Sequence, residues 1–145
     1  MDATEHYQRL IKMYAAAPIN DFYRPQMSIE AGLAKIVIAL SDKLHHAAGA
    51  VHGSVYFKML DDAAFFAANS LEMEYFLLTT SFTTYLTRPV SQGSMRAVGK
   101  VVNQNKTQFI VESVVYDEQG QEIGRGSGLF IRSKQRLMQT PGYLG

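Results

Sequence analysis

The pattern of hydrophobic and polar positions first predicts two helices. Near the N-terminus, apolar residues recur at helical spacing, so we expect a helix that is capped by Asp2 or Thr4 and ends near Ala17. Residues 19–26 have no period and contain aromatic residues near two prolines, which favours a loop. The second helix is expected over Gly53–Ser70, where the sequence is apolar almost all round and belongs in a core.

Alternating apolar and polar positions predict strands elsewhere. The segment from Ser28 to Leu40 has this alternation with a turn or bulge at Gly32 inside it, and we expect one long, bent strand. Four further strand-like runs follow the second helix, separated by turn residues, at 77–87, 94–105, 107–117 and 121–133. The residues after 133 have little apolar period and are expected to fray.

These elements predict an α+β fold in which one long helix lies across a curved antiparallel sheet. We expect three parts along the chain: an N-terminal helix and loop (1–27), a central domain (28–133) and a C-terminal tail (134–145). The chain has 145 residues and no cysteine. A chain of this length can bury a core of its own, and disulfides and thiolate metal sites are excluded.

Composition limits the possible binding partners and the expected cellular location of the protein. The formal net charge is +1 with scattered basic residues, so the chain lacks the basic stripe that nucleic-acid binding requires. No apolar segment is long enough to span a membrane, and the first residues lack the features of a signal peptide, so we expect a cytoplasmic protein. Gly124, Gly126 and Gly128 indicate close packing rather than a phosphate loop, since no helix pattern follows them, and no cofactor is expected.

Asp61 and Asp62 lie in the middle of the apolar helix. A buried carboxylate is costly unless it is hydrogen-bonded or paired, so these two need a structural or a chemical role. Neighbours on a helix point about 100° apart, and we therefore expect one of them to be functional and the other structural. The alternative is that both form ion pairs with Arg or Lys where two subunits meet.

The same helix carries a recognisable motif. His52-Gly53-Ser54, Asp61 eight positions after Gly53, and Asn69-Ser70 at the helix end resemble the PaaI-type acyl-CoA thioesterases of the hotdog fold, relatives of 4-hydroxybenzoyl-CoA thioesterase. Arg88-Pro89 matches the end of the strand that follows the helix in this family. The resemblance runs from about residue 28 to residue 133 and implies a hotdog fold.

The resemblance implies that Asp61 is the catalytic carboxylate, acting as general base or nucleophile on an acyl-CoA thioester, and that the Gly53 N–H polarises the carbonyl. These two residues lie about 12 Å apart along one helix axis, too far to act on the same carbon. We therefore expect a homo-oligomer, either a dimer or a dimer of dimers. Antiparallel helices in the dimer would bring Gly53 of one subunit beside Asp61 of the other.

Five further residues are assigned to substrate binding on the same resemblance: His46, His52, Ser54, Thr79 and Arg88. His46 stands where the family has Asn, six positions before the motif histidine. His52 either orients the substrate or fixes its loop by a hydrogen bond to the backbone. Thr79 either lines the acyl end of the site or is an ordinary strand threonine. Arg88 is a candidate for the phosphates of coenzyme A, with Arg125 as a weaker one.

Other readings of the site remain open. His45, His46, His52 and Asp61 match no familiar set of metal ligands, so no metal is expected. A hotdog hydratase or dehydratase would need a catalytic histidine paired with a carboxylate, for which His52 is available. A non-catalytic acyl-CoA binding or sensing module is the third possibility. A binding-only site does not need a carboxylate in an apolar helix, so Asp61 argues against it.

Overall fold

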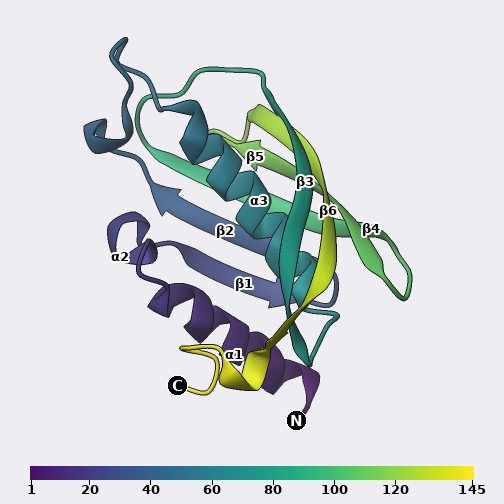
Figure 1. Ribbon diagram of the computed structural model, residues 1–145. Helices are drawn as coiled ribbons and strands as arrows, with labels where there is room; N and C mark the ends of the chain where they lie inside the picture. Colours follow the sequence, from purple (N-terminus) through teal and green to yellow (C-terminus); the bar gives the residue numbers. More distant parts are fainter.

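The long helix α3 lies across one curved antiparallel sheet of six strands in the computed structural model, which describes residues 1–145 (Figure 1). The strand order is β1-β2-β4-β5-β6-β3. The predicted α+β hotdog arrangement is confirmed. The helices are α1 (Ala3–Ala16), α2 (Asn20–Tyr23) and α3 (Gly53–Asn69), and the strands are β1 (Gln26–Glu30), β2 (Leu33–Ala39), β3 (Tyr75–Leu86), β4 (Ser94–Gln104), β5 (Gln108–Tyr116) and β6 (Glu122–Arg136).

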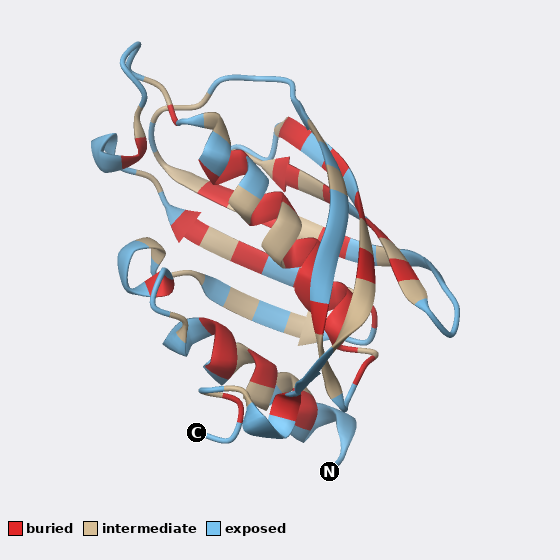
Figure 2. Ribbon diagram, viewed as in Figure 1, coloured by how far each residue is buried: buried red, intermediate tan, exposed pale blue.

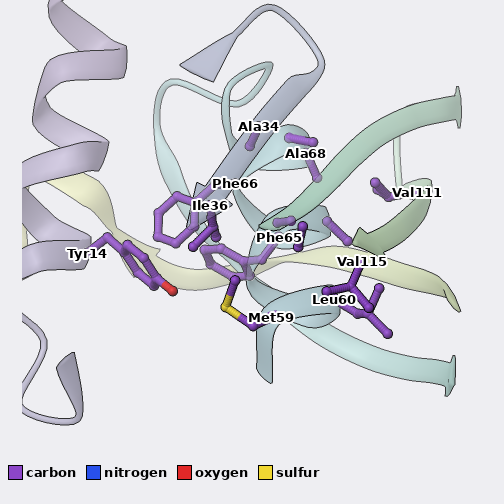
Figure 3. Packing of buried hydrophobic residues seen from close by; sticks show 14 of the residues in the cluster. Tyr14, Ala34, Ile36, Met59, Leu60, Phe65, Phe66, Ala68, Val111 and Val115 are labelled. Carbon is purple, nitrogen blue, oxygen red and sulfur yellow. The ribbon is translucent and has the colours of Figure 1, made fainter. Parts of the chain in front are cut away.

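Helix α3 is held close to the sheet by small residues. An added Cβ on Gly99 of β4 would lie 2.3 Å from the Ala63 carbonyl oxygen, so the strand and the helix backbone are nearly in contact. On β5, the Ser113 hydroxyl donates to the Leu60 carbonyl oxygen at 2.7 Å. Figure 3 shows Met59, Leu60 and Phe65 of this helix inside the core. The almost wholly apolar sequence of α3 is explained by its burial on several sides.

The first strand prediction is wrong in one respect. The segment expected to be one long bent strand is a hairpin, in which β1 pairs antiparallel with β2 from Gln26↔Val37 to Glu30↔Leu33. Gly32 has φ +70°, a conformation that lets the chain reverse direction instead of bending. Its N–H donates to the Ser70 hydroxyl at 2.8 Å, which ties this turn to the end of α3.

The loop predicted over residues 19–26 contains the short helix α2. Its residues Asn20–Tyr23 lie between the two prolines that suggested a loop, and Arg24 ends the helix in the left-handed region with φ +49°. The Asn20 amide donates to the Tyr14 carbonyl oxygen at 2.7 Å, so the end of α1 holds this turn in place. One helical turn is too short to show a hydrophobic period in the sequence.

Strand β3 occupies an edge of the sheet. Strands β4, β5 and β6 form a meander, in which each strand pairs with the next along the chain, whereas β3 pairs only with β6 and leaves its other edge open. Its surface is largely exposed along the half that leads to Leu86, as Figure 2 shows. Strand β1 is the other edge of the sheet. Open strand edges are available for pairing with a second chain, so β3 can pair with a strand of a partner.

The prediction of a fraying tail is wrong. Strand β6 continues to Arg136, and Leu137 and Tyr143 beyond it are fully buried. The ring of His6 on α1 bridges the Tyr143 hydroxyl at 2.7 Å and the Asn69 carbonyl oxygen at 2.8 Å. The N-terminal helix and the tail therefore pack together beside the end of α3, with both chain ends at the same side of the molecule (Figure 1).

Candidate active site

Asp61 lies in the middle of α3, half-buried and without an ion pair in the chain. Its Oδ1 accepts a hydrogen bond from the Thr79 hydroxyl of β3 at 2.8 Å. Burial raises the pKa of Asp61 to about 6, the hydrogen bond from Thr79 opposes this rise, and the neighbouring charge of Asp62 adds to it. The group is ionised at neutral pH yet basic enough to take up a proton, as a general base requires.

Asp62 has a different environment from its neighbour. Its Oδ2 pairs with Lys58 Nζ at 2.6 Å and accepts from the Tyr14 hydroxyl, also at 2.6 Å. Lys58 further stacks on the rings of Tyr14 and Tyr23 at 5.1 and 4.9 Å from their centroids. Asp62 thus joins α3 to α1, which is the structural role that the helical spacing predicts for one of the two carboxylates.

A bulge in β3 lets this strand contact α3 at two separated points. Thr79 touches Asp61, and Leu86 Cδ1 would lie 3.0 Å from an added Cβ on Gly53. Residues seven apart face opposite sides of a regular strand. The register with β6 shifts between Thr79 and Ser81, so Thr80 is an extra residue and both contacts fall on the helix side.

The start of α3 is organised by His52. This residue is the N-cap, and its Nδ1 accepts a hydrogen bond from the Ser54 N–H at 3.0 Å. The Ser54 hydroxyl is 2.9 Å from the same nitrogen. Of the two roles open to His52, the structure shows the hydrogen bond that fixes the loop. The Gly53 N–H makes no hydrogen bond within the chain, so a donor at the positive end of the helix dipole is available.

A pocket of about 330 Å³ opens at this end of the helix. It brings together His46, Gly53 and Arg88, three of the residues that the sequence places in the site. The exposed Arg88 side chain has one long contact, 3.4 Å to Gln121 Oε1, while its carbonyl accepts from the Tyr56 hydroxyl at 2.7 Å. Its guanidinium can therefore reorient toward a ligand.

Several of the residues that the sequence places in the site lie outside this pocket, among them His52 and Thr79. Ser54 is exposed beside His52 and does not line the cavity. Arg125 forms an ion pair with Glu122 through two contacts, 2.7 and 2.6 Å, and alternates with the inward-facing Gly124 and Gly126. It thus lies on the face of β6 away from α3 and does not line this pocket; its role as a phosphate ligand stays a prediction.

A second and larger cavity, of about 540 Å³, lies beside Asp61. Thr79, Asp62 and Lys58 contribute its polar lining near α3. The remaining walls come from the end of α1, the residues that lead into α2, three phenylalanines and the tail residues Thr140 and Pro141. Sequence reasoning missed the tail and the segment after α1, because neither shows a motif and both acquire their place only through tertiary packing.

Within one chain the two candidate catalytic groups therefore belong to different pockets. Gly53 lines the smaller pocket and Asp61 the larger one. Eight residues of α-helix separate them by about 12 Å. No group of three or more His, Asp or Glu side chains is arranged to hold a metal ion. No helix combines the length and the apolar character that crossing a bilayer requires.

Comparisons with known proteins agree on the family and the fold. A family model described as "Thioesterase superfamily" matches residues 48–123, which include all of α3 and the strands up to the start of β6. A curated protein of Saccharolobus solfataricus, named as a candidate esterase, is 20% identical over 112 residues, which are 77% of this chain and 75% of that protein.

Two solved structures have the same fold. The E. coli PaaI protein, from the phenylacetic acid degradation operon, superposes with a TM-score of 0.84 at 18% identity, over 92% of this chain and 97% of that one. A thioesterase family protein from Silicibacter pomeroyi has a TM-score of 0.80 at 21% identity, with 87% of this chain and 96% of that chain covered. These two structures match 92% and 87% of this chain, whereas the family model matches residues 48–123 alone. The shared fold therefore includes most of the segment before residue 48.

Proposed function

The chain belongs to the thioesterase superfamily and has the hotdog fold, and from that premise we propose that it hydrolyses acyl-CoA thioesters at a site shared between two subunits. One observation carries the proposal: Asp61 is a half-buried carboxylate without an ion pair, has a pKa of about 6 and lines an apolar cavity. A carboxylate held in this state is suited to attack or to activate water.

The proposed reaction uses three groups. Asp61 takes a proton from water that attacks the thioester carbonyl, or attacks that carbon itself. The Thr79 hydroxyl, which donates to Asp61 Oδ1, holds the carboxylate in position. The free Gly53 N–H of the partner subunit donates to the carbonyl oxygen as negative charge develops on it. The C–S bond then breaks and the coenzyme A thiolate leaves, taking up a proton. When water is the nucleophile, the carboxylic acid is released at once; when Asp61 is the nucleophile, the acyl group stays on it as an anhydride, which water then hydrolyses to release the acid and free Asp61.

The open edge of β3 supplies the geometry for the dimer. Strand β3 contacts α3 near Asp61 through Thr79 and near Gly53 through Leu86. Antiparallel pairing of two β3 strands about a two-fold axis sets the Leu86 end of one chain against the Thr79 end of the other. Gly53 of one subunit then lies beside Asp61 of its partner, as the composite site requires.

The direction of side chains limits the registers of this pairing, and we propose the one centred on Thr83. Phe82 faces α3, where its ring lies 5.7 Å from that of Phe57, so Thr83 faces the opposite side. Opposite residues of an antiparallel pair point to the same side of a sheet. A two-fold axis at Thr83 satisfies this rule and places Leu86 opposite the bulge at Thr79 and Thr80.

The smaller pocket is then the coenzyme A side of the shared site. His46 and Arg88 line it together with Gly53, and a guanidinium forms paired hydrogen bonds with phosphate oxygens. The acyl side falls in the partner's larger cavity, beyond Asp61. The substrate would thus pass from one subunit to the other at the scissile bond.

The test is release of free thiol from a panel of acyl-CoAs by the purified protein. Asp61→Asn should lower turnover by at least about a hundredfold while dimerisation and binding persist. Asp62→Asn is the matched control, since it changes the neighbouring carboxylate that already has structural partners. Acyl-CoA binding without thiol release, or equal turnover of wild type and Asp61→Asn, would overturn the proposal and favour a binding module.

The oxyanion donor can be tested separately. Proline is accepted at the first position of a helix, and His52 before it already has ψ +142°, so Gly53→Pro removes the N–H without breaking α3. Gly53→Ala keeps the N–H and adds the same crowding against Leu86. We expect a loss of about 10²-fold or more in kcat for the proline variant alone. Equal losses in both variants would exclude the donor role.

A further inference from the structure

The larger cavity has a composition that bears on the identity of the substrate. Its walls are mostly apolar, and three phenylalanines form one side: Phe65 lies 5.0 Å from Phe66 and 5.1 Å from Phe76 between ring centroids. Tyr14 of α1 packs on Phe66 at 4.8 Å. A cavity of about 540 Å³ is in the range that holds an organic group of several carbon atoms.

The charges in the cavity are confined to the end next to the scissile bond. Lys58 is the one cation among its lining residues, and it is already paired with Asp62 at 2.6 Å. The remaining charge is that of Asp61 itself. A carboxylate carried on the far end of an acyl group would therefore meet an apolar wall, without a free cation to pair with.

Much of the cavity is built by segments outside the family match. That match covers residues 48–123, whereas half of the lining residues lie outside it, at positions 13, 14, 16–20, 140 and 141. Ala17 is one of these residues, a small side chain with an extended backbone at φ −61° and ψ +131°. Its side chain leaves volume that a larger residue would fill.

We propose that this cavity holds the acyl group and selects an uncharged, apolar acyl chain larger than acetyl, with the segment after α1 setting its length. This inference rests on the proposed hydrolysis of acyl-CoA and adds the substrate class. Burial of each methylene contributes about 0.8 kcal/mol, so kcat/KM should rise about fourfold per added methylene until the cavity is full.

The experiment measures kcat/KM for straight-chain acyl-CoAs from two to twelve carbons, together with adipoyl-CoA. Hexanoyl-CoA and adipoyl-CoA have the same number of carbons and differ in a terminal carboxylate, so this pair isolates charge from length. We expect hexanoyl-CoA to be preferred by at least about a hundredfold. Comparable kcat/KM values for the two, or no rise in kcat/KM beyond acetyl-CoA, would overturn the inference.

Substitutions in the wall test the location of the acyl group. Ala17→Phe should shorten the preferred chain, and Phe76→Ala should lengthen it. Ala15→Phe is the matched control, because Ala15 is exposed in the last turn of α1, two residues before Ala17, and does not line the cavity. If both cavity variants retain the wild-type chain-length profile, the acyl group binds elsewhere. If Ala17→Phe does not fold, Phe76→Ala alone decides.

The results of these experiments distinguish a failure of this inference from a failure of the proposed thioesterase function on which it rests. Hydrolysis that requires Asp61 but ignores chain length and the cavity variants would refute the acyl cavity and leave the thioesterase proposal standing. Absence of thiol release from every acyl-CoA would refute the thioesterase proposal, and with it the substrate class.

Discussion

At the scale of single residues, the contrast between Asp61 and Asp62 is the centre of the proposed site. Both are aspartates on α3, yet Asp62 is bound by Lys58 and Tyr14 whereas Asp61 has only the Thr79 hydroxyl. Helical spacing predicts that the two diverge, and the family motif selects Asp61. The Thr79 contact depends on a bulge that the run of threonines and serine does not reveal.

The hydrogen bond from Thr79 should be visible in the pH dependence of activity. It lowers the pKa of Asp61 against the raising effect of burial, so Thr79→Val should raise that pKa further. The ionised carboxylate is the active form, and the acid limb of the kcat/KM profile should therefore move to higher pH. Between pH 8 and pH 6, the kcat/KM of Thr79→Val should fall several-fold more than the kcat/KM of wild type.

Thr79→Ser serves as the control for that profile, because serine retains a hydroxyl at the same position. Its acid limb should coincide with that of wild type, near the Asp61 pKa of about 6. An identical midpoint for the valine variant would show that Thr79 does not act on the carboxylate.

At the scale of elements, the sequence predicted α3 closely from its long apolar run, and β4, β5 and β6 from their alternation and the turn residues between them. It missed the β1–β2 hairpin, since Gly32 is compatible with either a bulge or a reversal and only its φ of +70° distinguishes them. The one-turn helix α2 was missed because four residues carry no period. Local pattern thus predicts long elements better than the turns between them.

The contact between α3 and β4 should be intolerant of any side chain at Gly99. A Cβ there would lie 2.3 Å from the Ala63 carbonyl oxygen and 2.6 Å from the Ala64 nitrogen, both backbone atoms that cannot yield separately. Gly99→Ala should therefore lower the free energy of unfolding by about 3 kcal/mol or more, measured by urea denaturation.

Gly120→Ala is the comparison for that measurement. Nothing lies within 4 Å of its added Cβ, and its φ of +81° carries only a backbone cost, of about 1 kcal/mol. Equal destabilisation by the two substitutions would mean that α3 does not rest on the backbone of β4 as described.

At the scale of the whole molecule, the chain ends are part of the packed body. The tail was expected to fray because its residues have no apolar period, but Tyr143 and Leu137 are fully buried beside α1. Single anchoring residues in an irregular segment leave no periodic signal. The domain boundaries proposed at residues 28 and 133 stay a prediction. Residues of α1, α3 and the tail line the same cavity, so these three segments pack against one another.

His6 should make the join between the chain ends sensitive to acid. Burial lowers its pKa, and its ring donates from Nε2 to the Asn69 carbonyl while Nδ1 accepts from Tyr143, an arrangement that needs the neutral form. The unfolded state then binds more protons, so stability is present above the unfolded pKa of about 6.5 and is lost as pH falls below it.

Urea unfolding of wild type and His6→Gln checks this dependence at about pH 8 and pH 5. Wild type should lose more stability than the variant between the two conditions, since the other titrating groups are common to both. An equal loss would show that His6 does not titrate as described.

The assembly predicts a cross-link at the two-fold axis. The chain has no cysteine, so a single Thr83→Cys substitution gives one thiol per subunit. Directly opposite residues have Cβ atoms about 5 Å apart, close enough for a disulfide after a small shift. Oxidation should yield a covalent dimer on non-reducing gels, whereas Thr107→Cys in the exposed β4–β5 turn should yield monomer. Monomer from both would reject this register.

The shared site itself is tested most directly by mixing two inactive proteins. Asp61→Asn and Gly53→Pro chains are combined in equal amounts, unfolded and refolded together, and thiol release from acyl-CoA is measured. Random pairing makes half of the dimers mixed, and each mixed dimer has one intact site, so about a quarter of wild-type activity should return. If mixed dimers form and activity stays at the level of the separate variants, Gly53 and Asp61 do not act together across the subunits.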